Sequence, residues 1–199
     1  LVPMVGSALL IGANWLIYIW AVTNGHIAAA SLGYFLNPLL NVLLGFLFLK
    51  ERLTRWQGFA VALAGVGVAI LATGALEALW ISLSLALTFG FYGLIRKVAP
   101  VGPMVGLASE TIILLPAALA ALWWWSHTAT GHFGTLGPIT DALLIAGGVV
   151  TAVPLLLFAS AARRMRYATI GLIQYIGPTI QFLLAIFLYR EALTTTHLV

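Results

Sequence analysis

Two asparagines lie on one face of an apolar stretch that is long enough to cross a bilayer. In the run 30–49, Gly33, Asn37, Asn41 and Gly45 recur at every fourth position, so a helix would place them together. Amide side chains are costly in hydrocarbon unless they face a cavity or bond to another helix. They donate and accept hydrogen bonds but do not act as nucleophiles or transfer protons. The pattern therefore indicates noncovalent binding of a small molecule inside a membrane.

A second stretch, 168–189, offers the amides Gln174 and Gln181 in a matching arrangement. Pro38 and Pro178 each lack a backbone N–H, which leaves the carbonyl four residues earlier without its helical partner. Two helices thus present amides and helix breaks at a similar depth. For any single residue the alternative is packing, because small residues let helices approach and amides bond across the interface. The paired faces as a set favour a cavity.

Further polar residues could reach the same cavity. Asn14 and Tyr18 lie one helical turn apart with Trp15 beside them, in the middle of another apolar run. Tyr92 ends a series of hydroxyls at four-residue spacing on a later run. Hydroxyl side chains can also bond to a backbone carbonyl of their own helix, which is the alternative for that series.

Glu110 is an acidic residue well inside the apolar run 103–125. An intramembrane carboxylate is by default a functional-site hypothesis, either as a proton carrier or as the partner of a cation. The alternatives are a structural pair with Arg96 or Lys97, or a protonated, hydrogen-bonded side chain. The sequence indicates no cofactor, so proton coupling through Glu110 is the coupling hypothesis that it raises.

Bond-making chemistry finds no support in the residue pattern. The chain has no Cys, and its four His show no metal-ligand spacing, so neither a metal site nor a catalytic site is predicted. An intramembrane enzyme would need a nucleophile with a base, or a motif such as His-Glu-x-x-His. This rival and a second one, a passive channel, stay as alternatives to a transporter. Saturable counterflow would identify a carrier, whereas an ohmic single-channel current would identify a pore.

The elements that must position these residues are membrane-spanning helices. Of the 199 residues 62% are hydrophobic and 7% are charged, whereas soluble domains carry about 25% charged residues. Apolar runs of about 20 residues predict membrane helices. Seven such runs are expected, followed by the start of an eighth, which indicates an all-α, multi-span helical bundle. The runs are 4–23, 30–49, 56–75, 78–95, 103–125, 139–162 and 168–189.

Eight of the nine basic residues fall in connections that would lie on the same side of the membrane. By the positive-inside rule this side is the cytoplasm, and the residues are expected to set topology and to meet lipid phosphate rather than nucleic acid. These topology anchors are Lys50, Arg52, Arg55, Arg96, Lys97, Arg163, Arg164 and Arg166.

An internal repeat relates the two ends of the chain. A shift of 140 residues lays 28–54 on 168–194 without a gap, with eight of 27 positions identical. Pro38 falls on Pro178 and the pair Lys50-Glu51 on Arg190-Glu191. The interval contains five helices, and an odd number implies two halves of opposite orientation, as in many secondary transporters.

The repeat defines the expected domains. Residues 1–75 would hold the last three helices of a first five-helix repeat, and 76–199 a second five-helix repeat that is truncated in its last helix. Two helices would then precede residue 1 and most of a tenth would follow residue 199, so the chain is expected to lack both ends of a ten-helix protein.

Several motifs that mix polar and apolar residues resemble the RarD-type branch of the EamA family, within the drug/metabolite transporter superfamily. They are the runs 14–22 (NWLIYIWAV), 30–39 (ASLGYFLNPL), 91–97 (FYGLIRK) and 174–179 (QYIGPT). The resemblance covers the whole chain. It implies two inverted five-helix halves in the bacterial cytoplasmic membrane and export of a small metabolite or drug by alternating access.

The expected partners are therefore the lipid bilayer and a small-molecule substrate, whose identity the sequence does not specify, nor does it specify the oligomeric state. The residues assigned to the substrate cavity are Asn14, Trp15, Tyr18, Tyr34, Asn37, Asn41, Tyr92, Glu110, Gln174, Tyr175 and Gln181.

Overall fold

The computed structural model describes residues 2–73, 79–127, 134, 137–177 and 179–180, and within them every regular element is a helix. The helices are α1 (Val2–Thr23), α2 (Ile27–Leu49), α3 (Arg55–Thr73), α4 (Leu79–Val98), α5 (Pro103–Ser126), α6 (Pro138–Arg164) and α7 (Tyr167–Gln174). The predicted all-helical class is therefore confirmed. The first six helices begin and end within three residues of the predicted runs.

Five helices, α1, α2, α4, α5 and α6, are long and apolar enough to cross a membrane. The apolar part of α3, Arg55–Ile70, is shorter than these spans. For the seventh predicted run the structure describes α7 and a few residues beyond it, and the positions from 181 onward lie outside the described residues. A chain in lipid must satisfy its backbone groups internally, which is why apolar runs of this length form helices.

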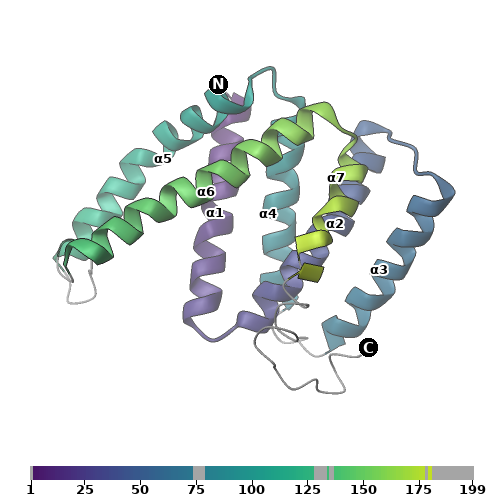
Figure 1. Ribbon diagram of the computed structural model, residues 1–199, viewed down its shortest axis with the longest axis horizontal. Helices are drawn as coiled ribbons and strands as arrows, with labels where there is room; N and C mark the ends of the chain where they lie inside the picture. Colours follow the sequence, from purple (N-terminus) through teal and green to yellow (C-terminus); the bar gives the residue numbers. More distant parts are fainter. Residues whose placement is uncertain (1, 74–78, 128–133, 135–136, 178, 181–199) are drawn as a thin grey trace.

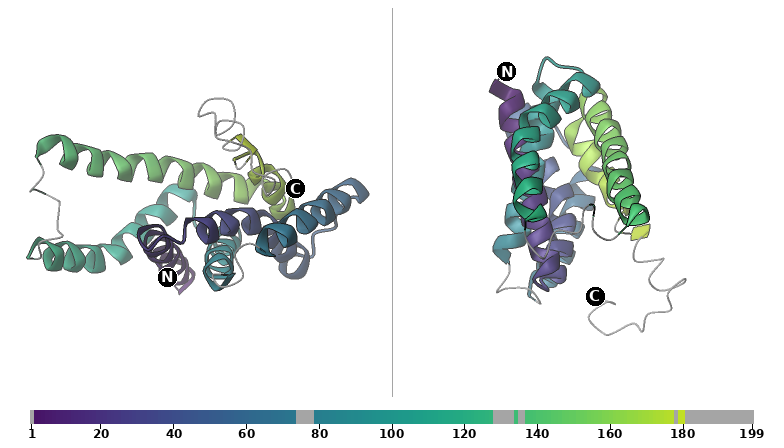
Figure 2. Two further views of the ribbon diagram at one scale, coloured as in Figure 1. Left: turned by 90° about the horizontal axis from the view of Figure 1, so that it is seen from below. Right: turned by 90° about the vertical axis from the view of Figure 1, so that its left-hand side faces the viewer.

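The helices form two layers, with α6 and α7 lying across a layer that contains α1 to α5 (Figure 2). In the larger layer α4 packs between α1 and α2, and α3 packs against α2 at the edge of the molecule (Figure 1). The second layer is joined to the first where α7 packs on α2 and where α6 packs on α4 and α5.

Two buried clusters of side chains lie at different depths of the bundle. One cluster lies near the junction of α1 and α2 and comprises Ala21, Ala29, Ala30, Ile81 and Leu85. The other, which we term the inner cluster, lies toward the opposite ends of the helices and comprises Leu44, Leu94, Ala162, Tyr167 and Ile170. It draws residues from α2, α4, α6 and α7, so four helices from both layers meet there.

The C-terminal ends of α2, α4 and α6 meet at one end of the bundle, the upper end in Figure 1. Seven of the eight predicted topology anchors belong to these helix ends or to the connections that follow them, and the eighth, Arg55, is the first residue of α3. We refer to this end as the basic end. The α1–α2 connection lies at the opposite end (Figure 1).

Candidate binding cavity between the two layers

A cavity of about 330 Å³ lies between the two layers, and Ala30 and Leu85 of the first buried cluster form part of its wall. Among the described residues that line it, none carries a charge. Residues from α1, α2, α4 and α6 contribute to its wall, together with α7 and the residues just beyond it. They are Ile11, Asn14, Trp15, Tyr18, Ala30, Gly33, Tyr34, Asn37, Leu85, Phe89, Leu155, Gln174 and Gly177.

Aromatic rings form one side of the cavity. Tyr18 is central, with its ring edge-on to Trp15 at 6.2 Å between centroids and edge-on to Tyr34 at 5.8 Å. Such edge-to-face pairs hold each ring in a defined orientation. This side of the wall therefore consists of aromatic rings of fixed orientation, two of which carry hydroxyl groups.

Amide groups supply the polar part of the wall. The Asn14 amide donates to the Leu85 carbonyl at 2.9 Å and to the Thr88 hydroxyl at 2.8 Å, so the side chain is fixed against α4. Asn37 is 8% exposed, and its Oδ1 has no hydrogen-bond partner among the residues that the structure describes. Because an unsatisfied buried acceptor is costly, Asn37 is the lining residue best suited to receive a hydrogen bond from a bound molecule.

Asn41 lies behind the cavity wall rather than in it. It is fully buried and donates to Gln174 Oε1 at 2.5 Å, which orients the Gln174 amide from the neighbouring helix. Tyr175 also lies outside the cavity wall, and its hydroxyl donates to the Phe35 carbonyl of α2 at 3.2 Å. Pro38 follows Phe35 by about one turn of α2, and because it has no backbone N–H it interrupts the helical hydrogen bonds there.

Six of the residues assigned from the sequence thus line the cavity, and four others do not. Those in the wall are Asn14, Trp15, Tyr18, Tyr34, Asn37 and Gln174. Asn41, Tyr92, Glu110 and Tyr175 lie elsewhere. Gln181 and Pro178 lie outside the described residues.

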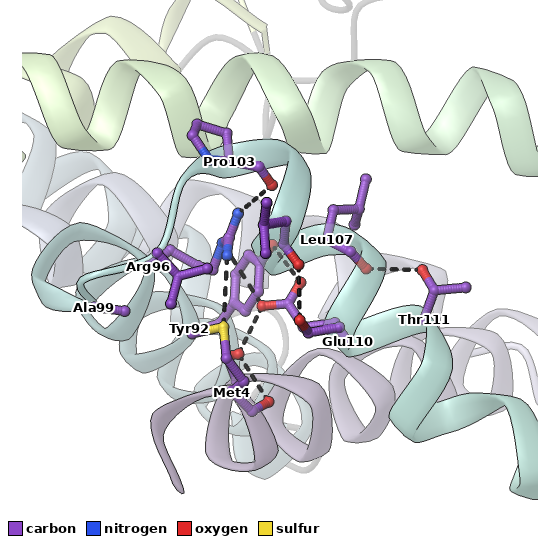
Figure 3. Close-up of polar contacts among 12 residues, drawn as sticks. Met4, Tyr92, Arg96, Ala99, Pro103, Leu107, Glu110 and Thr111 are labelled. Atoms are coloured by element: carbon purple, nitrogen blue, oxygen red, sulfur yellow. Dashed lines mark hydrogen bonds and ion pairs between the residues drawn. The ribbon is translucent and has the colours of Figure 1, made fainter. Parts of the chain in front are cut away.

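Glu110 is part of a separate buried network at the α1–α4–α5 contact (Figure 3). Its carboxylate accepts a hydrogen bond from the Ser7 hydroxyl at 2.6 Å and one from Tyr92 at 3.4 Å. Arg96 Nε lies 3.6 Å from Glu110 Oε1, and both side chains are 1% exposed. The geometry corresponds to the structural pair with Arg96 that the sequence left as an alternative for Glu110.

Arg96 corrects one sequence-based expectation. Its side chain does not extend to lipid phosphate, because the guanidinium is enclosed in the bundle and donates to the Pro103 carbonyl at 2.8 Å (Figure 3). Gly106 makes room for it, since a Cβ at that position would overlap Arg96 Nη1. The sequence offers Arg96 both as a topology anchor and as a possible partner of Glu110, and the structure shows it paired with Glu110.

Two other predicted anchors also bond within the protein. Lys97 donates to the Ala162 carbonyl at 2.9 Å, and Arg163 donates to the Ala99 carbonyl at 2.7 Å. Both carbonyls lie at or just beyond the last turns of helices, where backbone acceptors lack helical partners. Besides their effect on orientation, these residues therefore fasten α4 to α6.

Sequence reasoning missed Ser7 and Glu51. Ser7 sits among small apolar residues and gives no signal of its own. Glu51 is noted in the sequence only for its place in the repeat, and its carboxylate accepts hydrogen bonds from the first residues of α7. The one available hint was its coincidence with Glu191 in the repeat.

The fold and the cavity define a class of protein: a multi-pass helical membrane protein that encloses a cavity with polar and aromatic residues between its layers. Among the described residues no group of three His, Cys, Asp or Glu could hold a metal ion.

Residues 2–73 match the model of the EamA-like transporter family. An uncharacterized transporter of Pseudomonas aeruginosa is 50% identical over 199 residues, covering 99% of this chain and 66% of the relative. Protein RarD of Escherichia coli is 50% identical over 187 residues, covering 93% of this chain and 62% of the relative. The chloramphenicol-sensitive protein RarD of Pseudomonas aeruginosa is 35% identical over 192 residues, covering 96% and 62%.

The chain belongs to the EamA family, and the resemblance to RarD-type proteins expected from its motifs is confirmed. It spans slightly less than two thirds of the length of these relatives. No solved structure matches it.

Proposed function

We propose that the full-length protein is a transporter that exports a small metabolite or drug across the bacterial cytoplasmic membrane by alternating access. The observation that carries this proposal is the position of the cavity. Its wall takes Asn14 and Asn37 from 1–75, the first predicted half, and Gln174 from 76–199, the second. In inverted-repeat transporters the substrate binds between the halves, which rock against each other and expose it to each side in turn.

The lining residues favour binding over catalysis. Amides, tyrosine hydroxyls and aromatic rings hold a molecule by hydrogen bonds and ring contacts, and the described wall contains no base or metal ligand to activate a nucleophile. The named relatives are transporters and RarD proteins, which supports a non-enzymatic role. The substrate itself is what the experiment below identifies.

The first test compares metabolites outside cells that lack the gene with those outside cells that carry it in full length. A substrate should accumulate in the medium with the wild-type gene and not with the empty vector. Asn37→Ala removes a hydrogen-bonding group worth about 0.5–1.5 kcal/mol, so export at limiting substrate should fall roughly two- to tenfold. Mass spectrometry of culture supernatants measures the change.

Asn24→Ala is the matched control, since it makes the same chemical change at an exposed position in the α1–α2 connection. It should export as the wild type does. Equal export by Asn37→Ala and Asn24→Ala at equal protein levels would remove the cavity from the transport path. In liposomes the purified protein should show saturable counterflow of the identified substrate, and an ohmic single-channel current would contradict a carrier.

A further inference from the structure

The carboxylate of Glu51 ties the two predicted halves together at the basic end. Its Oε1 accepts the N–H of Tyr167 at 2.8 Å, and its Oε2 accepts the N–H of Ala168 at 2.9 Å. These N–H groups open α7 and have no partner within that helix. A carboxylate is favoured at a helix N-terminus because it also meets the positive end of the helix dipole. A residue that follows α2 therefore caps a helix of the opposite half.

The backbone around Glu51 is shaped for this contact. Lys50 adopts the left-handed conformation, with φ of 53°, which few residues with a Cβ adopt. This turn directs the N–H groups of both Lys50 and Glu51 to the Gly45 carbonyl. A Cβ at Gly45 would lie 2.9 Å from Glu51 Oε2 and 3.2 Å from the Ala168 nitrogen, so glycine permits the close approach of α2 to α7.

Lys97 extends the same contact to two further helices. Its Nζ lies 3.9 Å from Glu51 Oε1 and donates to the Ala162 and Met165 carbonyls at 2.9 and 2.5 Å. The end of α4, the end of α6 and the start of α7 thus converge on one carboxylate. The Glu51 side chain is 11% exposed, so its ion pair with Lys97 is partly shielded from solvent.

Packed side chains lie between this contact and the cavity. The inner cluster fills the space next to Glu51, and Val42, 2% exposed, lies one turn closer to the cavity. Asn41 and Gln174 then bond across the helices at the base of the cavity. Val42 and the Asn41–Gln174 hydrogen bond therefore stand between the cavity and the Glu51 contact.

We propose that Glu51 is a latch that holds the transporter closed toward the cytoplasm and must release Tyr167 and Ala168 whenever the cavity opens to that side. The inference rests on the proposed alternating-access function. The conformation described here is the one in which the latch is engaged. Replacing the carboxylate by an amide removes the charge and one of two acceptors, so Glu51→Gln shifts the population toward the cytoplasm-open state.

The test measures the accessibility of Val42→Cys in the full-length protein, with any other cysteine replaced. A membrane-impermeant thiol reagent is applied to inside-out vesicles, and the labelling rate is followed. Glu51→Gln should raise the rate on the order of tenfold, as expected for the loss of one charge-assisted hydrogen bond. Arg164→Gln, which removes an exposed charge at the same end, should leave it unchanged. A rate in Glu51→Gln equal to that in the parent overturns the latch.

A second variant keeps the test decisive if Glu51→Gln does not yield folded protein, as judged by size-exclusion chromatography. Lys97→Gln retains the carboxylate and removes its cationic neighbour, so labelling should rise in the same direction, and an unchanged rate overturns the proposal. The accessibility measurement does not depend on transport. Loss of the labelling effect with normal export would refute the latch alone, whereas absent export with the labelling effect intact would refute the proposed function.

Discussion

At the scale of single residues, two sets of polar side chains inside this protein differ in their surroundings. One set is satisfied by protein partners, as Glu110 is by Ser7, Tyr92 and Arg96. The other set lines the cavity, where Asn37 keeps an acceptor without a partner among the described residues. A buried charge without its partner is far more costly than a buried amide, which separates the expected effects of mutations in the two sets.

The first prediction concerns the Arg96–Glu110 pair. Glu110→Gln leaves the Arg96 guanidinium buried without a countercharge, and breaking such a pair costs about 3–5 kcal/mol. The purified full-length protein should therefore lose thermal stability, as measured by its Tm in detergent. The pH dependence of substrate uptake in vesicles should stay that of the wild type, because the pair lies outside the cavity wall.

Asp141→Asn provides the control, since this acid bonds to the Gly134 N–H near the start of α6, in a setting open to solvent. It should change the Tm little. A Glu110→Gln variant of normal stability with an altered pH profile would instead support a proton-carrying role for Glu110.

How far the sequence predicted the site can be judged residue by residue. Asn14, Asn37 and Gln174 were placed in the cavity because amides in apolar runs need polar surroundings and shared faces could be read from their spacing. Glu110 carried an equally strong signal of the same kind. The sequence names Arg96 as one possible partner of Glu110, but the choice between this pair and a cavity position depends on how α4 and α5 meet, which helical periodicity does not specify.

At the scale of elements, the approach of α7 to α2 determines how the two layers meet. Gly171 faces the break that Pro38 makes in α2, and a Cβ there would lie 2.6 Å from the Pro38 carbonyl oxygen. The helix bounds themselves were predictable, since turn formers interrupt apolar runs of membrane length. The pairing of helices was not, because many small residues on several helices could have supplied such a close contact.

The second prediction follows from that contact. Gly171→Ala must push α7 away from backbone atoms that cannot rotate aside, which separates Asn41 from Gln174 as well. We expect a loss of about 1–3 kcal/mol, the usual cost of overpacking, seen as a lower Tm of the full-length protein.

Gly177→Ala makes the same substitution just beyond α7, where a Cβ would meet no atom of the described residues within 4 Å. It should leave the Tm near that of the wild type. Equal Tm values for the two variants would mean that α7 is not held against α2 as described.

At the scale of the whole molecule, the predicted repeat can be tested through its orientation. The shift of 140 residues pairs the α1–α2 connection around Asn24 with the α6–α7 connection around Arg164. These connections lie at opposite ends of the bundle (Figure 1), and their charges differ in the way that the positive-inside rule requires of inverted copies. The sequence could suggest this inversion because charge and loop position are local properties.

The last prediction labels both connections in the full-length protein. Asn24 and Arg164 are exposed, and the chain has no Cys, so Asn24→Cys and Arg164→Cys give single reporters here once any other cysteine is replaced. In intact spheroplasts an impermeant thiol reagent should modify Asn24→Cys and spare Arg164→Cys, and inside-out vesicles should reverse the pattern. Arg163 and Arg166 remain in the second variant, so the charge that sets orientation is largely kept. Labelling of both positions from the same side would rule out the inverted relation between the halves, and with it the placement of the cavity between them.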